Sequence, residues 1–143
     1  MTSINRSALV MHSVGEMYSL VNDVSNYPNF MDGCVGVEIY EHSDSMMLAR
    51  LDLKKAGVSM SFITRNYLDA PNTIRMTLEE GPFKTFRGDW MFTPLSAKGC
   101  KIELDLQFEF ISKTMSFAAS ELFSRVSSRL VKSLCNRAND IYS

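Results

Sequence analysis

The sequence contains few of the residues from which enzyme and metal sites are built. It has two histidines, His12 and His42, and three cysteines, Cys34, Cys100 and Cys135. Two histidines this far apart do not suggest a catalytic or metal-binding pair. An odd number of widely spaced cysteines argues against a disulfide framework and against the paired CxxC spacing of a zinc site. We therefore expect no metal site, no catalytic residues, no catalytic cofactor and a reducing, cytoplasmic environment.

Several common motifs and global features are also missing. There is no GxSxG, Walker loop, GxGxxG or HExxH, so the sequence lacks the parts for hydrolysis, phosphoryl transfer and nicotinamide chemistry. A net charge of −1 gives no overall attraction to nucleic acid or to an anionic membrane. No apolar run approaches the roughly 20 residues that span a bilayer. We expect a non-enzymatic protein that does not bind DNA and has no transmembrane segment; transient membrane contact stays open.

What the chain does contain is a clear change of hydrophobic period. A strand is expected from Ile4 to Met11, and then a helix with Ser13 as its N-cap and Glu16 completing a capping box. From 35 to 111 apolar residues alternate with period two, which predicts an antiparallel meander. The residues after 111 include no glycine or proline and predict one long helix. The apolar stripe of this helix is Met115, Ala119, Leu122, Val126, Leu130, Leu134, Ala138 and Ile141.

These elements predict an α+β fold of one domain, residues 1–143. A curved antiparallel sheet would grip the long C-terminal helix, with two short helices after the first strand. A sheet curled around one helix has difficulty filling its own interior, which favours a ligand cavity over a core filled by side chains. The side chains expected to line the cavity are Met47, Leu51, Met60, Phe62, Met76, Phe83, Phe86, Trp90, Phe92, Leu104, Phe108, Leu122, Phe123 and Val126.

The stretch "NYPNFMDG" places bulky apolar side chains on a one-turn segment. Tyr27, Pro28, Phe30 and Met31 are too apolar for a free loop and too few for an independent core. Two interpretations compete: an ordinary turn that caps the core, or a lid over an apolar tunnel. We favour the lid.

The C-terminal helix also carries a basic ridge. Arg125, Arg129 and Lys132 follow one another at spacings of four and three, on the side opposite the apolar stripe. Exposed faces of helices are ordinarily charged, so a plain solvated surface is one interpretation. Contact with RNA phosphates is the other, and no aromatic residues are interleaved with these cations to read bases.

Three stretches of the chain resemble a known family. They are "SALVMHSVGEMYSLVNDVSNYPNFMDGC", "KAGVSMSFITRN" and "EEGPFKTFRGDWMFTPL". Together they are similar to the ribosome association toxins (RatA) and the mitochondrial coenzyme Q-binding proteins, within the superfamily of polyketide cyclases. The resemblance covers nearly the whole chain. It implies a START-like helix-grip fold, a hydrophobic tunnel between sheet and helix, and no catalysis.

The resemblance implies two functions of different classes. The first, which we favour, is binding of ubiquinone or a related isoprenoid lipid in the tunnel, in support of respiration. The alternative is binding of the large (50S) ribosomal subunit, which would block 70S association and inhibit translation initiation. A polyketide-cyclase enzyme ranks third, because that reaction needs polar groups inside a cavity that we expect to be apolar.

Overall fold

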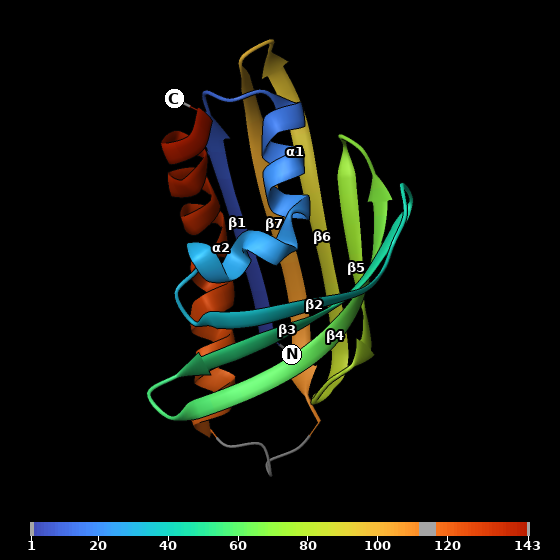
Figure 1. Cartoon of the computed structure of the whole chain (residues 1–143), viewed down its shortest axis with the longest axis vertical. Coiled ribbons are helices and arrows are strands. Elements are labelled where there is room, and N and C mark those ends of the chain that lie inside the picture. Colours follow the sequence, from blue (N-terminus) through green and yellow to red (C-terminus); the bar gives the residue numbers. More distant parts are fainter. Residues whose placement is uncertain (1, 112–116, 143) are drawn as a thin grey trace.

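A curved, seven-stranded antiparallel sheet wraps around a long C-terminal helix (Figure 1). This computed structural model describes residues 2–111 and 117–142, so Met115 of the predicted stripe lies outside the described residues. The expected α+β helix-grip architecture is confirmed. Its elements are β1 (Thr2–Val10), α1 (Val14–Asn22), the 3₁₀ helix η1 (Val24–Asn29), β2 (Cys34–His42), β3 (Met46–Lys55), β4 (Val58–Asp69), β5 (Thr73–Glu80), β6 (Phe83–Ser96), β7 (Gly99–Phe110) and α2 (Phe117–Tyr142).

The sheet follows the chain as a meander with one exception. Strands β2 to β7 pair with their sequence neighbours, and β1 joins the far edge by pairing with β7, giving the order β1-β7-β6-β5-β4-β3-β2. On β7, Leu104, Leu106 and Phe108 are buried, while Asp105 and Gln107 between them are exposed. This is the alternation of a sheet with one face on the core and one in water.

Local sequence determines where α1, the first of the two short helices after β1, begins. The Oγ atom of Ser13 accepts a hydrogen bond from the Glu16 backbone N–H at 3.2 Å, and the Glu16 carboxylate accepts one from the Ser13 N–H at 3.0 Å. The predicted capping box is therefore confirmed, and it starts α1 at the expected residue. Met17 and Val21 on the buried face of α1 then fix this helix over the sheet.

The apolar face of α2 differs from the predicted stripe in the middle of the helix and at its last turn. Val126 and Leu130 are only half-buried, whereas Phe123, Ser127 and Val131 are buried. Ser127 and Val131 lie about 100° further around the helix than Val126 and Leu130, so the buried face is rotated toward them. Ile141, in the last turn, is 46% exposed.

The turn before β2 packs closely on α2 through Gly33. Its φ is +94°, and a Cβ built on it would lie 2.7 Å from Cγ2 of Val126. The Gly33 carbonyl also accepts a hydrogen bond from the Lys54 N–H at 2.9 Å. Only glycine combines this backbone conformation with this close approach.

Replacing Gly33 by alanine should lower the free energy of unfolding by about 2–5 kcal/mol. Backbone strain of about 1–2 kcal/mol adds to overpacking of about 1–3 kcal/mol against Val126. Gly57 is the matched control, because its φ is +81° but a Cβ there would meet nothing within 4 Å. Gly57→Ala should therefore show the strain alone in urea denaturation. Equal losses in the two variants would contradict the close packing of this turn on α2.

Candidate functional site

An apolar cavity of about 80 Å³ lies between the sheet and α2. Its wall comes from the end of α1, η1, five strands and α2. The lining residues are Val21, Asn22, Val24, Tyr27, Leu51, Phe62, Thr64, Asn66, Ile74, Met76, Phe86, Trp90, Leu104, Leu106, Phe123, Ser127 and Leu130.

Half of the side chains predicted to line a cavity do so. They are Leu51, Phe62, Met76, Phe86, Trp90, Leu104 and Phe123. Val126 instead packs against Gly33. The remaining six are buried in the core outside the cavity lining: Met47, Met60, Phe83, Phe92, Phe108 and Leu122.

Aromatic packing explains why the interior is only partly hollow. The Phe123 ring on α2 meets five phenylalanine rings of the sheet at centroid distances of 4.8–6.4 Å. They are Phe62, Phe83, Phe86, Phe108 and Phe110. The rings fill one part of the interior, and the cavity is the space that remains. Both sequence interpretations, a filled core and a cavity, therefore hold in different parts of the molecule.

The expectation of an almost wholly apolar interior is wrong at three residues. Thr64, Asn66 and Ser127 are 3%, 6% and 6% exposed, and all three line the cavity. The alternation along β4 places two of these residues in the interior, because Val58, Met60 and Phe62 on its inner face are followed by Thr64 and Asn66. In the described part of the chain, Oδ1 of Asn66 has no hydrogen-bond partner.

The predicted lid covers the cavity through one residue. Tyr27 is buried, lines the cavity and donates a hydrogen bond from its hydroxyl to the Val21 carbonyl. Burial raises the pKa of this hydroxyl. Pro28, Phe30 and Met31 do not line the cavity; Met31 is buried in the core and the other two are half-buried.

Phe30 links the lid to the C-terminal helix instead. Its ring packs edge-on against the Tyr27 ring at 5.8 Å, and the guanidinium carbon of Arg137 on α2 lies 5.4 Å from its centroid. This cation–π contact holds the outer side of η1 against α2.

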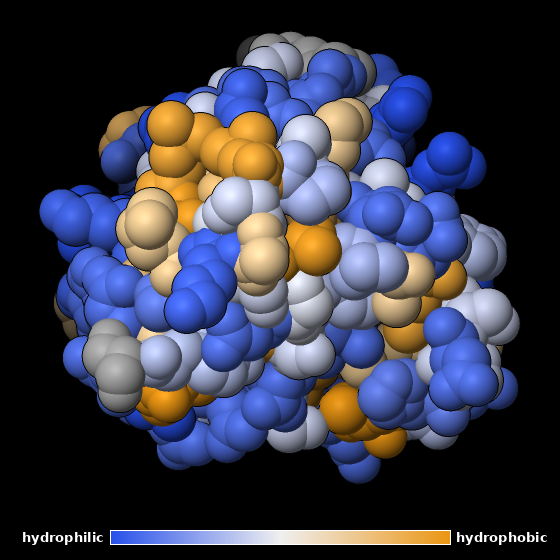
Figure 2. Space-filling view, turned by 90° about the horizontal axis from the view of Figure 1, so that it is seen from above, coloured by the Kyte–Doolittle hydropathy of each residue, from blue (hydrophilic) through white to orange (hydrophobic). Residues whose placement is uncertain are grey.

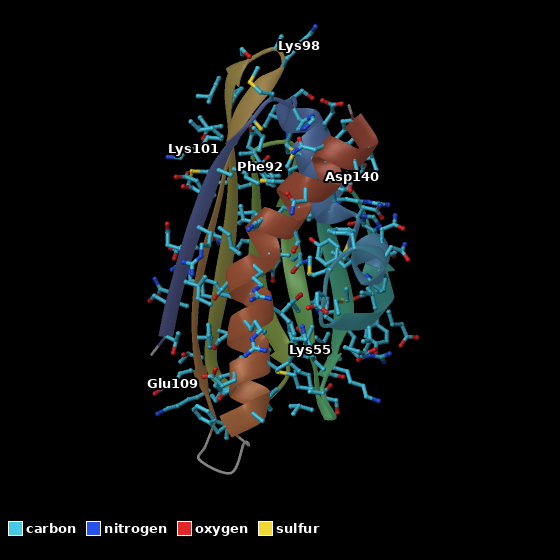
Figure 3. The ribbon with its side chains drawn as sticks, turned by 90° about the vertical axis from the view of Figure 1, so that its left-hand side faces the viewer. Lys55, Phe92, Lys98, Lys101, Glu109 and Asp140 are labelled. Carbon is cyan, nitrogen blue, oxygen red and sulfur yellow. The ribbon has the colours of Figure 1, made fainter. Side chains whose placement is uncertain are left out.

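A basic surface runs along the outer side of α2. Arg125, Arg129 and Lys132 are all exposed. Lys55, the last residue of β3, lies beside α2 (Figure 3) and forms an ion pair with Asp32. The hydrogen bond from Lys55 lowers the pKa of Asp32, and Arg129 and Arg125 lower it further. The fold therefore adds Lys55 to this basic surface, which the helical spacing alone could not show.

Two other surface features carry less chemistry. A hollow of about 730 Å³ on the sheet is lined by charged residues of both signs, and its two arginines, Arg75 and Arg87, pair with Asp89 at 3.9 and 3.1 Å. At the end of the molecule seen in Figure 2, apolar surface lies among hydrophilic residues. Leu9, Met11 and Leu95 are each at least 60% exposed. Transient membrane contact remains a prediction.

The described residues offer no arrangement for a metal. Among residues 2–111 and 117–142, no three His, Cys, Asp or Glu side chains gather as ligands. In the same ranges, no helix is long and apolar enough to cross a membrane.

Comparison with known proteins assigns the family. The model of the family described as "Polyketide cyclase / dehydrase and lipid transport" matches residues 10–135. The chain belongs to this family. Its fold is similar to that of the ZhuI aromatase/cyclase from Streptomyces sp. R1128, with a TM-score of 0.84 and 20% identity, covering 99% of this chain and 96% of that one.

Two relatives confirm the resemblance seen in the sequence. The ribosome association toxin RatA of Vibrio cholerae is 45% identical over 142 residues, which cover 99% of each chain. The mitochondrial coenzyme Q-binding protein COQ10 homolog B of Xenopus laevis is 25% identical over 142 residues, covering 96% of this chain and 58% of that protein.

Proposed function

We propose that this member of the polyketide cyclase and lipid transport family binds ubiquinone or a related isoprenoid quinone without transforming it. The cavity between sheet and α2 carries this proposal, because apolar side chains from eight elements surround it. The name of the coenzyme Q-binding relative supports a quinone as the ligand. A carrier of this kind would support respiration.

The chemistry of the cavity wall supports binding rather than catalysis. Among its lining residues there is no carboxylate, histidine, cysteine, lysine or arginine. The hydroxyl of Tyr27 is the titratable group of the wall, and burial raises its pKa further above neutrality. A general base near neutral pH would need the opposite shift.

The cavity must widen when a lipid enters. Its 80 Å³ is well below the roughly 300–1,000 Å³ of typical ligand pockets. Met76 offers room, because its Cε lies 2.5 Å from the position where Gly88 would carry a Cβ. The flexible side chain of Met76 fills the space over Gly88. Rotation of this side chain would enlarge the cavity on one side by filling space on the other.

Lipid extraction tests the proposal. Protein purified from a quinone-producing host should yield a bound quinone in organic extracts analysed by mass spectrometry. Ser127→Leu, which fills the cavity, should carry several-fold less quinone, while Ser128→Leu on the neighbouring, half-buried position should carry the wild-type amount. Extracts without quinone from the wild type would reject the proposal.

We propose association with the large ribosomal subunit as a second function. The name of the RatA relative, which matches over nearly the whole length of both chains, supports it. So does the basic surface of Arg125, Arg129 and Lys132. Contact with phosphates should weaken steeply as salt rises, whereas burial of a lipid should not. Cosedimentation with 50S subunits that is indifferent to salt would count against this surface.

A further inference from the structure

The side-chain oxygen of Asn66 is buried and has no hydrogen-bond partner among the described residues. Asn66 is 6% exposed and lines the cavity from β4. Its neighbours across the sheet are Met47 on β3 and Met76 on β5. Thioether sulfurs are weak acceptors and donate nothing, so these neighbours cannot satisfy the amide oxygen.

An unsatisfied buried amide destabilises a fold unless something else binds it. An apolar residue at this position would bury well between the two methionines, yet the chain places an amide there. Thr64 and Ser127 bring two more polar side chains to the same cavity, whose remaining wall is largely aromatic and aliphatic. The wall therefore suits a ligand that is mostly apolar and carries a few oxygen atoms.

We propose that Asn66 hydrogen-bonds an oxygen on the ring of a quinone headgroup, which enters the cavity ring first. This inference rests on the proposed lipid-binding function and specifies which part of the lipid the cavity recognises. The headgroup ring, rather than the long tail, suits a small cavity walled by Trp90, Phe86 and Phe123.

An asparagine suits both redox forms of such a ring. Its amide nitrogen donates to a quinone carbonyl, and after a half-turn of the amide its oxygen accepts from a hydroquinone hydroxyl. Only the hydroquinone satisfies the unpaired Oδ1, whereas a quinone that accepts from the amide nitrogen leaves Oδ1 unpaired, so the hydroquinone should bind more tightly. A methylated benzene of the same size, or an isoprenoid alcohol without a ring, makes no such bond to Asn66 through a ring oxygen.

Trp90 supplies the readout for a binding experiment. It is the only tryptophan of the chain and lines the cavity. A tailless dimethoxy-methyl-benzoquinone and its hydroquinone are titrated while Trp90 fluorescence is followed, and a methylated benzene and farnesol compete against the bound quinone. Wild type, Asn66→Leu, Asn66→Val and the matched control Asn5→Leu, which removes an exposed amide on β1 outside the cavity lining, are compared.

We expect both Asn66 variants to bind quinone and hydroquinone at least about tenfold more weakly, while the methylated benzene binds as to wild type. Their melting temperatures should stay the same or rise, because an unsatisfied amide is removed; Asn66→Val remains informative if the larger leucine fails to fold. Asn5→Leu should keep quinone affinity near that of wild type, because Asn5 does not line the cavity.

Four results would overturn the assignment. Quinone affinity in the Asn66 variants equal to that of wild type would rule out the hydrogen bond, and an equal loss in Asn5→Leu would show that the effect is not specific to the cavity. Farnesol binding to a wild type that binds no ring compound would reject the headgroup assignment and leave the lipid cavity standing. A wild type that binds none of the four compounds would reject the lipid cavity as well.

Discussion

Replacing Phe123 by alanine is expected to lower the free energy of unfolding by about 3–5 kcal/mol. The ring is 2% exposed and is the point at which α2 meets the aromatic residues of the sheet. The rings of Phe108 and Phe83 lie closest, at 4.8 and 4.9 Å between centroids. Truncation removes the buried area of the ring and leaves a void that its packed neighbours cannot close.

Phe117 on the same helix provides the control for this prediction. Its ring is 79% exposed, so Phe117→Ala should change the free energy of unfolding by no more than about 0.5 kcal/mol. Chemical denaturation of both variants separates burial from helix propensity, because each replaces phenylalanine by alanine in α2. A loss in Phe123→Ala no larger than in Phe117→Ala would show that the rings do not hold sheet and helix together.

Reversing the three charges of the α2 basic surface should have a large effect on ribosome binding and a small one on folding. Arg125, Arg129 and Lys132 are exposed, so replacing all three by glutamate should cost little stability, within about 0.5 kcal/mol each. If each cation contacts a phosphate, affinity for 50S subunits at low salt should fall by orders of magnitude. The slope of log affinity against log salt should also become shallower by about two to three units.

A second triple variant isolates position from net charge. Arg6, Lys84 and Lys98 are also exposed but lie on β1, β6 and the β6–β7 turn. Reversing them changes the net charge equally and should leave the salt slope of cosedimentation near that of wild type. Quinone recovered from either variant should match wild type, since none of these six residues lines the cavity. Equal losses of subunit binding in both variants would show that binding depends on net charge and not on the position of these residues on α2.

Much of the fold follows from patterns that are local in the chain. The capping box of Ser13 and Glu16 starts α1, and the alternation in "CKIELDLQFEF" decides which face of β7 is buried, because successive side chains of a strand point to opposite faces. The long segment without glycine or proline forms α2. Each of these features depends on neighbours within a few residues, so it can be predicted from the sequence alone.

The candidate site was only partly predictable for the same reason. Alternation along β4 indicates that Phe62, Thr64 and Asn66 share the inner face. It cannot tell whether such a residue lines a cavity or packs against an aromatic ring. Helical spacing indicates that Arg125 and Arg129 share an exposed side, yet it cannot place Lys55 beside them. Such contacts depend on residues that are far apart in the chain.

The sequence by itself determined the order of the elements, the inner face of each strand and the exposed side of α2 with its basic residues. The tertiary structure decided where the interior is filled and where it is hollow, that Oδ1 of Asn66 is buried without a partner among the described residues, and that the Gly33 turn packs against Val126. These features depend on the sheet's curvature, the register between strands and the rotation of α2 about its own axis. Many distant contacts set those three quantities jointly, and no short stretch of sequence encodes any of them.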